Sequence, residues 1–126
     1  MKIQIVTILI VLVTVYTSCK KNDAPSVKQK LNPPSWIIGE WLVDGSHLGY
    51  RFTSDDMVSI TAFHEVSLKK NFESATVVES ITDSSYRVDA TIDQSTFKYY
   101  FKYVSATEIE DKTPAFVNFT RIYIKQ

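Results

Sequence analysis

From Trp36 onward, the dominant period in the pattern of apolar and polar side chains is two. Residues 84–93 show this most clearly, because their apolar positions are all two apart: Tyr86, Val88, Ala90 and Ile92. Successive side chains of a β-strand point to opposite faces of a sheet. The alternation therefore predicts half-buried strands rather than helices.

Eight segments with this pattern follow one another, and short polar turns separate most of them. They cover residues 37–45, 48–53, 57–63, 76–82, 84–93, 96–104, 106–112 and 116–125. Asp44-Gly45 is a strong hairpin signal, and residues 53–56 form a turn cluster. Parallel neighbours need a crossover of a dozen or more residues, so these connections predict an antiparallel meander.

Residues 65–75 interrupt the alternation. Leu68 and Phe72 are four positions apart, as on one side of a helix. We expect one short helix or lid near residues 66–74, with a bulged strand as the alternative. The predicted fold is thus all-β, with about eight antiparallel strands that close into a small barrel. A β-sandwich of two stacked sheets is the alternative.

The N-terminus has a different pattern. After Lys2, residues 3–16 form an apolar run that is shorter than the ~20 residues of a membrane-spanning helix. The small residues Thr17 and Ser18 follow, and then the single cysteine, Cys19. A positive start, an apolar middle and small residues before a cleavage point are the parts of a secretory signal peptide.

Thr17-Ser18-Cys19 and the polar residues behind it resemble the lipobox of bacterial lipoproteins, of the type found in the Bacteroidota. The resemblance implies that residues 1–18 are removed and that Cys19 carries acyl chains such as palmitate. Two or three acyl chains anchor a protein stably, whereas one chain is marginal. Plain secretion and a retained anchor helix are the alternatives. Cys19 is not a catalytic candidate in any of the three.

Residues 19–34 are polar, contain three prolines and follow neither apolar period. Such a segment predicts a flexible tether between the lipidated cysteine and a domain over residues 35–126. We therefore expect an outer membrane lipoprotein of the cell envelope. In related lipoproteins, acidic residues soon after the cysteine favour surface export. Lys20 and Lys21 stand there instead and favour the periplasmic face.

Gly39, Glu40 and Trp41 open the first predicted strand of the domain. Gly-x-Trp at this place resembles the signature of lipocalins and their calycin relatives. The resemblance implies a small lipocalin-like barrel whose base Trp41 closes, with an arginine of the last strand packed over the indole. Arg121 would be that arginine, in a cation–π contact of ~0.5–2 kcal/mol. The family's Thr-Asp-Tyr motif has an insertion here, at residues 82–86.

The composition excludes several kinds of chemistry. Fourteen basic and fourteen acidic residues cancel, so no basic excess points to nucleic acid. Two histidines and one cysteine are too few for a closed zinc site, and three glycines provide no phosphate-binding loop. No nucleophile, base and orienting group can be assembled from the sequence. We therefore expect neither an enzyme nor a cofactor.

Aromatic residues are frequent, with seven Tyr, seven Phe and two Trp. The richest set lies on the expected inner faces of two strands: Tyr50, Phe52, Phe97, Tyr99, Phe101 and Tyr103. These side chains could line an apolar ligand pocket with a few polar hydroxyls. They could equally form a solid core, because the interior of an eight-stranded barrel is just wide enough for side chains to fill.

Two functions therefore stay open. The first is a lipid-anchored envelope protein that binds a small apolar or amphipathic ligand in a barrel. The second is a non-enzymatic module with a filled barrel, which would act as an interaction, assembly or inhibitor protein on an envelope protein partner. In both cases the acyl chains on Cys19 are the link to the membrane.

Overall fold

The computed structural model describes residues 30–114 and 120–126. Within these residues the chain forms nine strands, one turn of 3-10 helix and one short α-helix. Their bounds are η1 (Ser35–Ile37), β1 (Gly39–Leu42), β2 (Gly49–Phe52), β3 (Met57–Ile60), β4 (Glu65–Ser67), α1 (Leu68–Asn71), β5 (Thr76–Ile81), β6 (Ser85–Ile92), β7 (Ser95–Ser105), β8 (Glu108–Asp111) and β9 (Arg121–Lys125).

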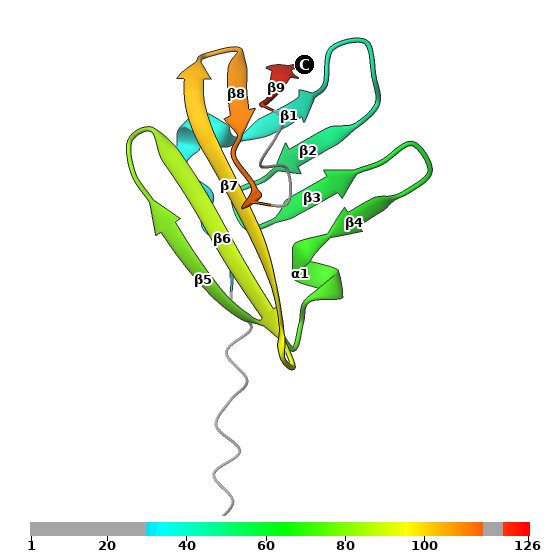
Figure 1. Ribbon diagram of the computed structural model, residues 1–126, viewed down its shortest axis with the longest axis vertical. Helices are drawn as coiled ribbons and strands as arrows, with labels where there is room; N and C mark the ends of the chain where they lie inside the picture. Colours follow the sequence, from blue (N-terminus) through cyan, green and yellow to red (C-terminus); the bar gives the residue numbers. More distant parts are fainter. Residues whose placement is uncertain (1–29, 115–119) are drawn as a thin grey trace, which may run out of the picture.

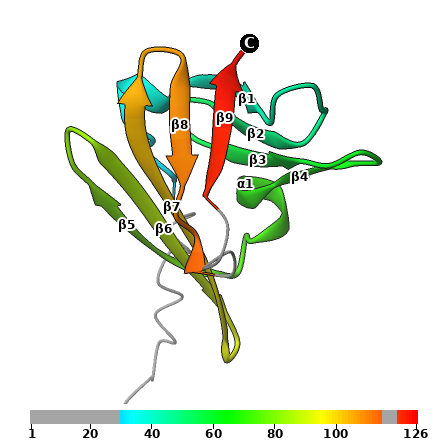
Figure 2. The same ribbon diagram turned by 45° about the horizontal axis from the view of Figure 1, so that its top comes forward.

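All nine strands belong to one antiparallel sheet in the order β4-β3-β2-β1-β9-β8-β7-β6-β5. The first and last strands are neighbours, and the sheet curls into a half-barrel (Figure 1). The predicted all-β antiparallel meander with one short helix is confirmed. The two edges of the sheet are β4 and β5, so the curl leaves one open side between them (Figure 2).

The ninth strand comes from the segment where the alternation stops. Glu65–Ser67 pairs with β3 for three residues, and the helix begins directly afterwards. Ser67 ends the strand and caps the helix, since its Oγ accepts a hydrogen bond from the backbone N–H of Lys70 at 3.1 Å. Leu68, in the first turn, is buried in the core. The expected helix is thus present, but it is shorter than residues 66–74.

Among the described residues, the first that packs into the core is Leu31, four residues before the expected start of the domain at residue 35. Leu31 is only 3% exposed and belongs to the core. The backbone N–H of Asn32 donates to Glu79 Oε1 at 2.9 Å, which ties this segment to β5. The segment from Leu31 to Trp36, called the N-terminal segment below, is therefore part of the fold.

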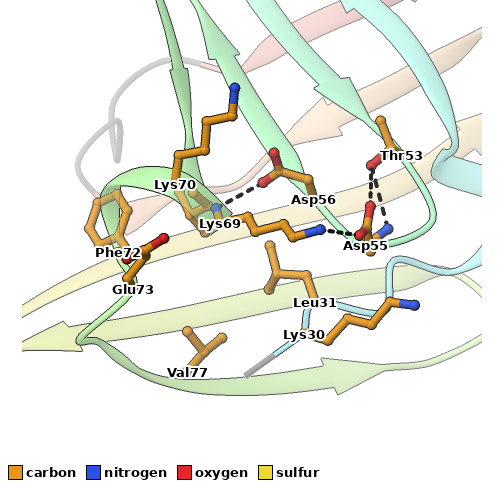
Figure 3. A pocket seen from close by; sticks show the side chains of 11 residues that line it. Lys30, Leu31, Thr53, Asp55, Asp56, Lys69, Lys70, Phe72, Glu73 and Val77 are labelled. Atoms are coloured by element: carbon orange, nitrogen blue, oxygen red, sulfur yellow. Dashed lines mark hydrogen bonds and ion pairs between the residues drawn. The ribbon is translucent and has the colours of Figure 1, made fainter. Parts of the chain in front are cut away.

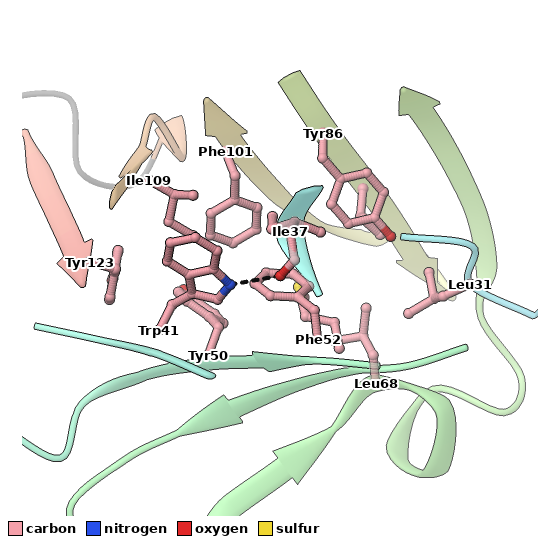
Figure 4. Close-up of a cluster of buried hydrophobic side chains, with 12 residues drawn as sticks. Leu31, Ile37, Trp41, Tyr50, Phe52, Leu68, Tyr86, Phe101, Ile109 and Tyr123 are labelled. Atoms are coloured by element: carbon pink, nitrogen blue, oxygen red, sulfur yellow. Dashed lines mark hydrogen bonds between the residues drawn. The ribbon is translucent and has the colours of Figure 1, made fainter. Parts of the chain in front are cut away.

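Aromatic rings fill the concave side of the sheet (Figure 4). Phe101 lies at the centre, with ring centroids 4.9 Å from Tyr50 and 5.1 Å from Phe52, both in edge-to-face geometry. Such pairs stabilise beyond the area they bury. The buried cluster consists of Leu31, Ile37, Trp41, Tyr50, Phe52, Met57, Leu68, Tyr86, Val88, Phe101, Ile109 and Tyr123.

Candidate ligand pocket

Three of the six aromatic residues that could line a pocket pack into the solid core. Tyr50, Phe52 and Phe101 are at most 7% exposed. Tyr99 is half-buried, and its ring centroid lies 6.4 Å from that of Tyr50. The centre of the half-barrel is therefore filled by protein.

The other two residues lie at the ends of the same face of β7. Phe97 is 45% exposed and packs its ring on Phe72, just after α1, at 5.4 Å. Tyr103 is 40% exposed and packs on Trp36, in the N-terminal segment, at 5.7 Å. The inner face of β7 is thus buried at Phe101 in the middle and partly exposed at Phe97 and Tyr103 near its two ends.

The phenol groups of the core stay protonated. Burial raises the pKa of Tyr86 well above its usual range, and the hydrogen bond from its hydroxyl to Glu79 Oε1 (2.6 Å) raises it further. Burial also raises the pKa of Tyr50 strongly, and the nearby charge of Asp111 adds to this effect. Protonated phenols act here as hydrogen-bond donors to carboxylates.

Trp41 is fully buried, and its Nε1–H donates to the carbonyl of Ile37 at 2.6 Å. The cation over its indole ring belongs to Lys125, whose Nζ lies 5.2 Å from the ring centroid. In the pairing of β1 with β9, Trp41 is opposite Lys125. Arg121 is instead opposite Asp111 of β8, and it lies four residues, or about 13 Å, from Lys125 along β9. Lys125 therefore occupies the place that the lipocalin resemblance assigns to Arg121.

A pocket of ≈ 590 Å³ lies on the open side of the half-barrel (Figure 3). Four elements enclose it: α1, the turn between β2 and β3, the start of the N-terminal segment, and β5. Its apolar wall consists of Leu31, Leu68, Phe72 and Val77. The rest of the lining is polar or charged: Lys30, Thr53, Asp55, Asp56, Lys69, Lys70 and Glu73.

Two aspartates hold α1 against the turn between β2 and β3. Asp56 accepts hydrogen bonds from the backbone N–H of Lys69 (2.9 Å), from Ser67 Oγ (2.5 Å) and from its neighbour Met57 (2.8 Å). The Lys69 ammonium forms an ion pair with Asp55, which lowers the pKa of Asp55 and raises that of Lys69. This side of the pocket is therefore fixed by direct bonds between two elements.

Sequence reasoning missed this pocket, because most of its lining residues come from segments that were expected to be a tether and a lid. Two signals were present. Leu31 is an apolar residue in an otherwise polar stretch, and the helical spacing of Leu68 and Phe72 predicts one apolar helix face. Nothing in the alternation shows that both segments meet Val77 of β5.

Within residues 30–114 and 120–126, no group of three or more His, Cys, Asp or Glu side chains is placed to hold a metal ion. In the same ranges no helix is long and apolar enough to cross a membrane. Cys19 and the expected signal peptide lie outside the described residues. Comparisons with models of known families, with curated proteins and with solved structures found no match.

Proposed function

We propose that this chain is a lipoprotein of the bacterial outer membrane, anchored by acyl chains on Cys19, that binds a small apolar or amphipathic ligand in the pocket beside α1. We also propose a lipocalin-like origin for its half-barrel. Gly39, Trp41 and the cation of Lys125 over the indole ring support that origin.

The pocket carries the proposal of ligand binding. Its volume of ≈ 590 Å³ falls within the range of about 300–1,000 Å³ that is usual for small-molecule sites. Its wall is apolar and its rim is charged, so one end of a ligand would be shielded from water while the other meets polar groups. The filled core around Phe101 excludes a ligand from the centre of the half-barrel.

Two neighbouring valines on β5 provide a matched test. Val77 lines the pocket, whereas Val78 points to the other face of the strand and is 63% exposed. Val77→Trp should fill the pocket, while Val78→Trp adds the same ring outside it. Native mass spectrometry of protein from its own envelope should show a bound small molecule for the wild type and Val78→Trp, and little for Val77→Trp. Bare lipoprotein mass for the wild type would exclude ligand binding.

The anchor has its own test. Labelled palmitate should attach to the wild type, and Cys19→Ala should abolish the label. Labelling that persists in this variant would exclude Cys19 as the attachment point. We propose the periplasmic face of the outer membrane, so protease added to intact cells should leave the protein uncut. Cleavage in intact cells would place it on the cell surface.

One observation favours the second candidate, a module that binds an envelope protein. Phe63, at the tip of the β3–β4 hairpin, is 94% exposed. The turn holds it outward, since Thr61 Oγ1 donates to the carbonyl of His64 (2.7 Å) and accepts from its N–H (3.2 Å). A photo-cross-linking residue placed at position 63 should then trap one protein partner in cells. The same probe at the neighbouring Ala62 is the control for position.

A further inference from the structure

The chain enters the folded part of the molecule at the pocket itself. Lys30 is the first described residue, and it also lines the pocket, next to the buried Leu31. Its positive charge acts on Asp55, in the turn between β2 and β3. Figure 3 shows Lys30 at one end of the pocket and Phe72 at the other. The point from which the chain leads back to Cys19 is therefore part of the mouth of the pocket.

The length of this connection limits how far the mouth can lie from the membrane. Eleven positions separate Lys30 from Cys19, the proposed attachment point. Eleven residues span at most about 40 Å when the chain is fully extended. Because acyl chains hold Cys19 at the bilayer surface, the mouth stays within this distance of the lipid head groups. The bilayer excludes the rest of the domain, so the mouth is on average the part of the domain closest to the membrane.

An apolar track leads from the mouth into the fold. Leu31 and Leu68 form its buried end, and Phe72 and Val77 are half-buried. Phe97 packs on Phe72 at 5.4 Å and is 45% exposed, so the track reaches the surface. The side chains of these five residues, called the apolar track below, offer no hydrogen-bond donor or acceptor. They suit a hydrocarbon chain.

The charges around the pocket select no particular head group. Three lysines and three carboxylates line it: Lys30, Lys69, Lys70, Asp55, Asp56 and Glu73. Their formal charges cancel, so the apolar track carries the recognition. A molecule that is recognised through a hydrocarbon chain is far more concentrated in a bilayer than in water, because each buried CH₂ group favours the bilayer. The membrane is therefore the nearest and richest supply of such a ligand.

We propose that the pocket takes its ligand directly from the bilayer that holds Cys19, and that this ligand is a membrane lipid with one hydrocarbon chain along the apolar track. The inference rests on the proposed function, because it names the source and class of the ligand for the same pocket. The mouth then faces the membrane. The turn between β7 and β8 points away from it, since this turn and α1 lie at opposite ends of the half-barrel (Figure 1 and Figure 2).

Labels at two positions test this orientation in the full lipidated chain, reconstituted in nanodiscs. Cys19 is the only cysteine, and lipidation occupies its sulfur, so an introduced cysteine is the single free thiol. Lys70→Cys places a fluorophore at the mouth, and Ala106→Cys places it in the exposed turn between β7 and β8. A quencher on the lipid head groups should quench the label at residue 70 several-fold more than the label at residue 106. Equal quenching at both positions would overturn the proposal.

A photoactivatable phospholipid in the same nanodiscs tests the source of the ligand. Peptide mapping should find label on residues 68–77 in the wild type and in Val78→Trp, and little in Val77→Trp. An insertion of about thirty Gly and Ser residues after Lys21 lowers the local concentration of the pocket at the bilayer, so labelling should fall several-fold. Labelling that this insertion leaves unchanged would overturn direct uptake from the bilayer.

The inference and the proposed function fail separately. If the wild type carries a small molecule that Val77→Trp loses, but the phospholipid does not label residues 68–77, the pocket remains a ligand site and the membrane is not its source. If the wild type carries no bound molecule and labelling persists in Val77→Trp, the proposed function is overturned as well.

Discussion

Gly39 shows how one residue without a side chain makes room for a charge. Its φ of +131° is a conformation that residues with a Cβ rarely adopt, and a Cβ there would lie 2.9 Å from Cε of Lys125. The lysine stem crosses this position before its ammonium group reaches the indole of Trp41. Gly39, Lys125 and Trp41 thus lie together where the first and last strands meet.

Gly39→Ala should lower the free energy of unfolding by about 1–3 kcal/mol, because an alanine at a φ of +131° keeps a strained backbone, whereas the flexible end of the Lys125 side chain can move away at little cost. Urea denaturation measures the loss. Gly45→Ala is the control, since Gly45 also has a positive φ (+68°) but no atom near its missing Cβ. Gly45→Ala should lower the free energy of unfolding by about 1 kcal/mol. A loss at Gly39 no larger than that at Gly45 would show that the φ of +131° strains an alanine no more than the φ of +68° does.

The buried tyrosines make stability fall at alkaline pH. Burial, with the charge of Asp111, raises the pKa of Tyr123 to about 12 from its ordinary value of 10.0. Between these pH values the unfolded chain loses a proton that the folded chain keeps. The free energy of unfolding should therefore decrease as pH rises, by up to about 1.4 kcal/mol per pH unit for each such tyrosine.

Urea denaturation between pH 8 and pH 11.5 tests this effect. Below about pH 10 the contribution of the raised pKa is fully present, and it is lost as pH rises toward 12. Tyr123→Phe should show a shallower decrease than the wild type. Tyr50 and Tyr86, whose pKa values burial raises further, continue to contribute in this variant. Identical slopes for the wild type and Tyr123→Phe would contradict the prediction.

At the scale of elements, the N-terminal segment fills space that a strand would otherwise occupy on the open side of the half-barrel. Leu31 reaches the core cluster, and Glu79 accepts hydrogen bonds from both Asn32 N–H and the Tyr86 hydroxyl. One carboxylate thus joins the entering chain to the aromatic core. The N-terminal segment closes part of the gap between β4 and β5 without pairing with either strand through β-sheet hydrogen bonds.

Leu31→Ala should lower the free energy of unfolding by about 2–3 kcal/mol, because it leaves a cavity beside Leu68 and the core. The neighbouring Lys30→Ala, at an exposed position, should change it by less than about 0.5 kcal/mol. Thermal or urea unfolding distinguishes the two. Equal stabilities for both variants would mean that the chain before residue 35 is only a spacer.

Helix α1 is too short to be stable by itself, since isolated helices need on the order of a dozen residues. Its hydrogen bonds to Asp56 replace the missing turns. Asp56→Ala should therefore accelerate hydrogen exchange at the Lys69 amide and cost about 1–2 kcal/mol of global stability. Asp83→Ala, which changes an exposed turn carboxylate, is the control. Unchanged exchange at Lys69 in Asp56→Ala would show that other contacts hold the helix.

For the whole molecule, the period of two was enough to predict the class of fold, because burial of one face acts on every residue of a strand. β4 was not among the eight predicted strands, and a bulged strand over residues 65–75 was only the alternative to the helix, because three residues cannot show a period and Ser67 serves both the strand and the helix. The register in which the last strand pairs with the first could not be predicted from the sequence either. Arg121, Tyr123 and Lys125 alternate in the same sense, so the sequence could not tell which cation lies opposite Trp41.

The candidate site was harder to predict than the fold. Tyr50, Phe52 and Phe101 were rightly placed on inner faces, but alternation says nothing about whether an interior is hollow. The pocket arises where two sheet edges stay apart, and this depends on contacts between residues 31, 68 and 77. Such long-range contacts leave no trace in a single sequence beyond the apolar character of each residue.

The junction between the first and last strands has one more consequence. β1 and β9 pair at two positions, Trp41 with Lys125 and Leu42 with Ile124, and one further backbone hydrogen bond joins Gln126 N–H to Glu40 O. The half formed by β1–β4 and the half formed by β5–β9 thus meet along a short line, opposite the side where they remain unpaired. The aromatic core joins the two halves a second time, because Tyr50 and Phe52 of β2 pack on Phe101 of β7. The spacing of the two sheet edges that flank the pocket therefore depends on the packing of these rings as well as on the short pairing of β1 with β9.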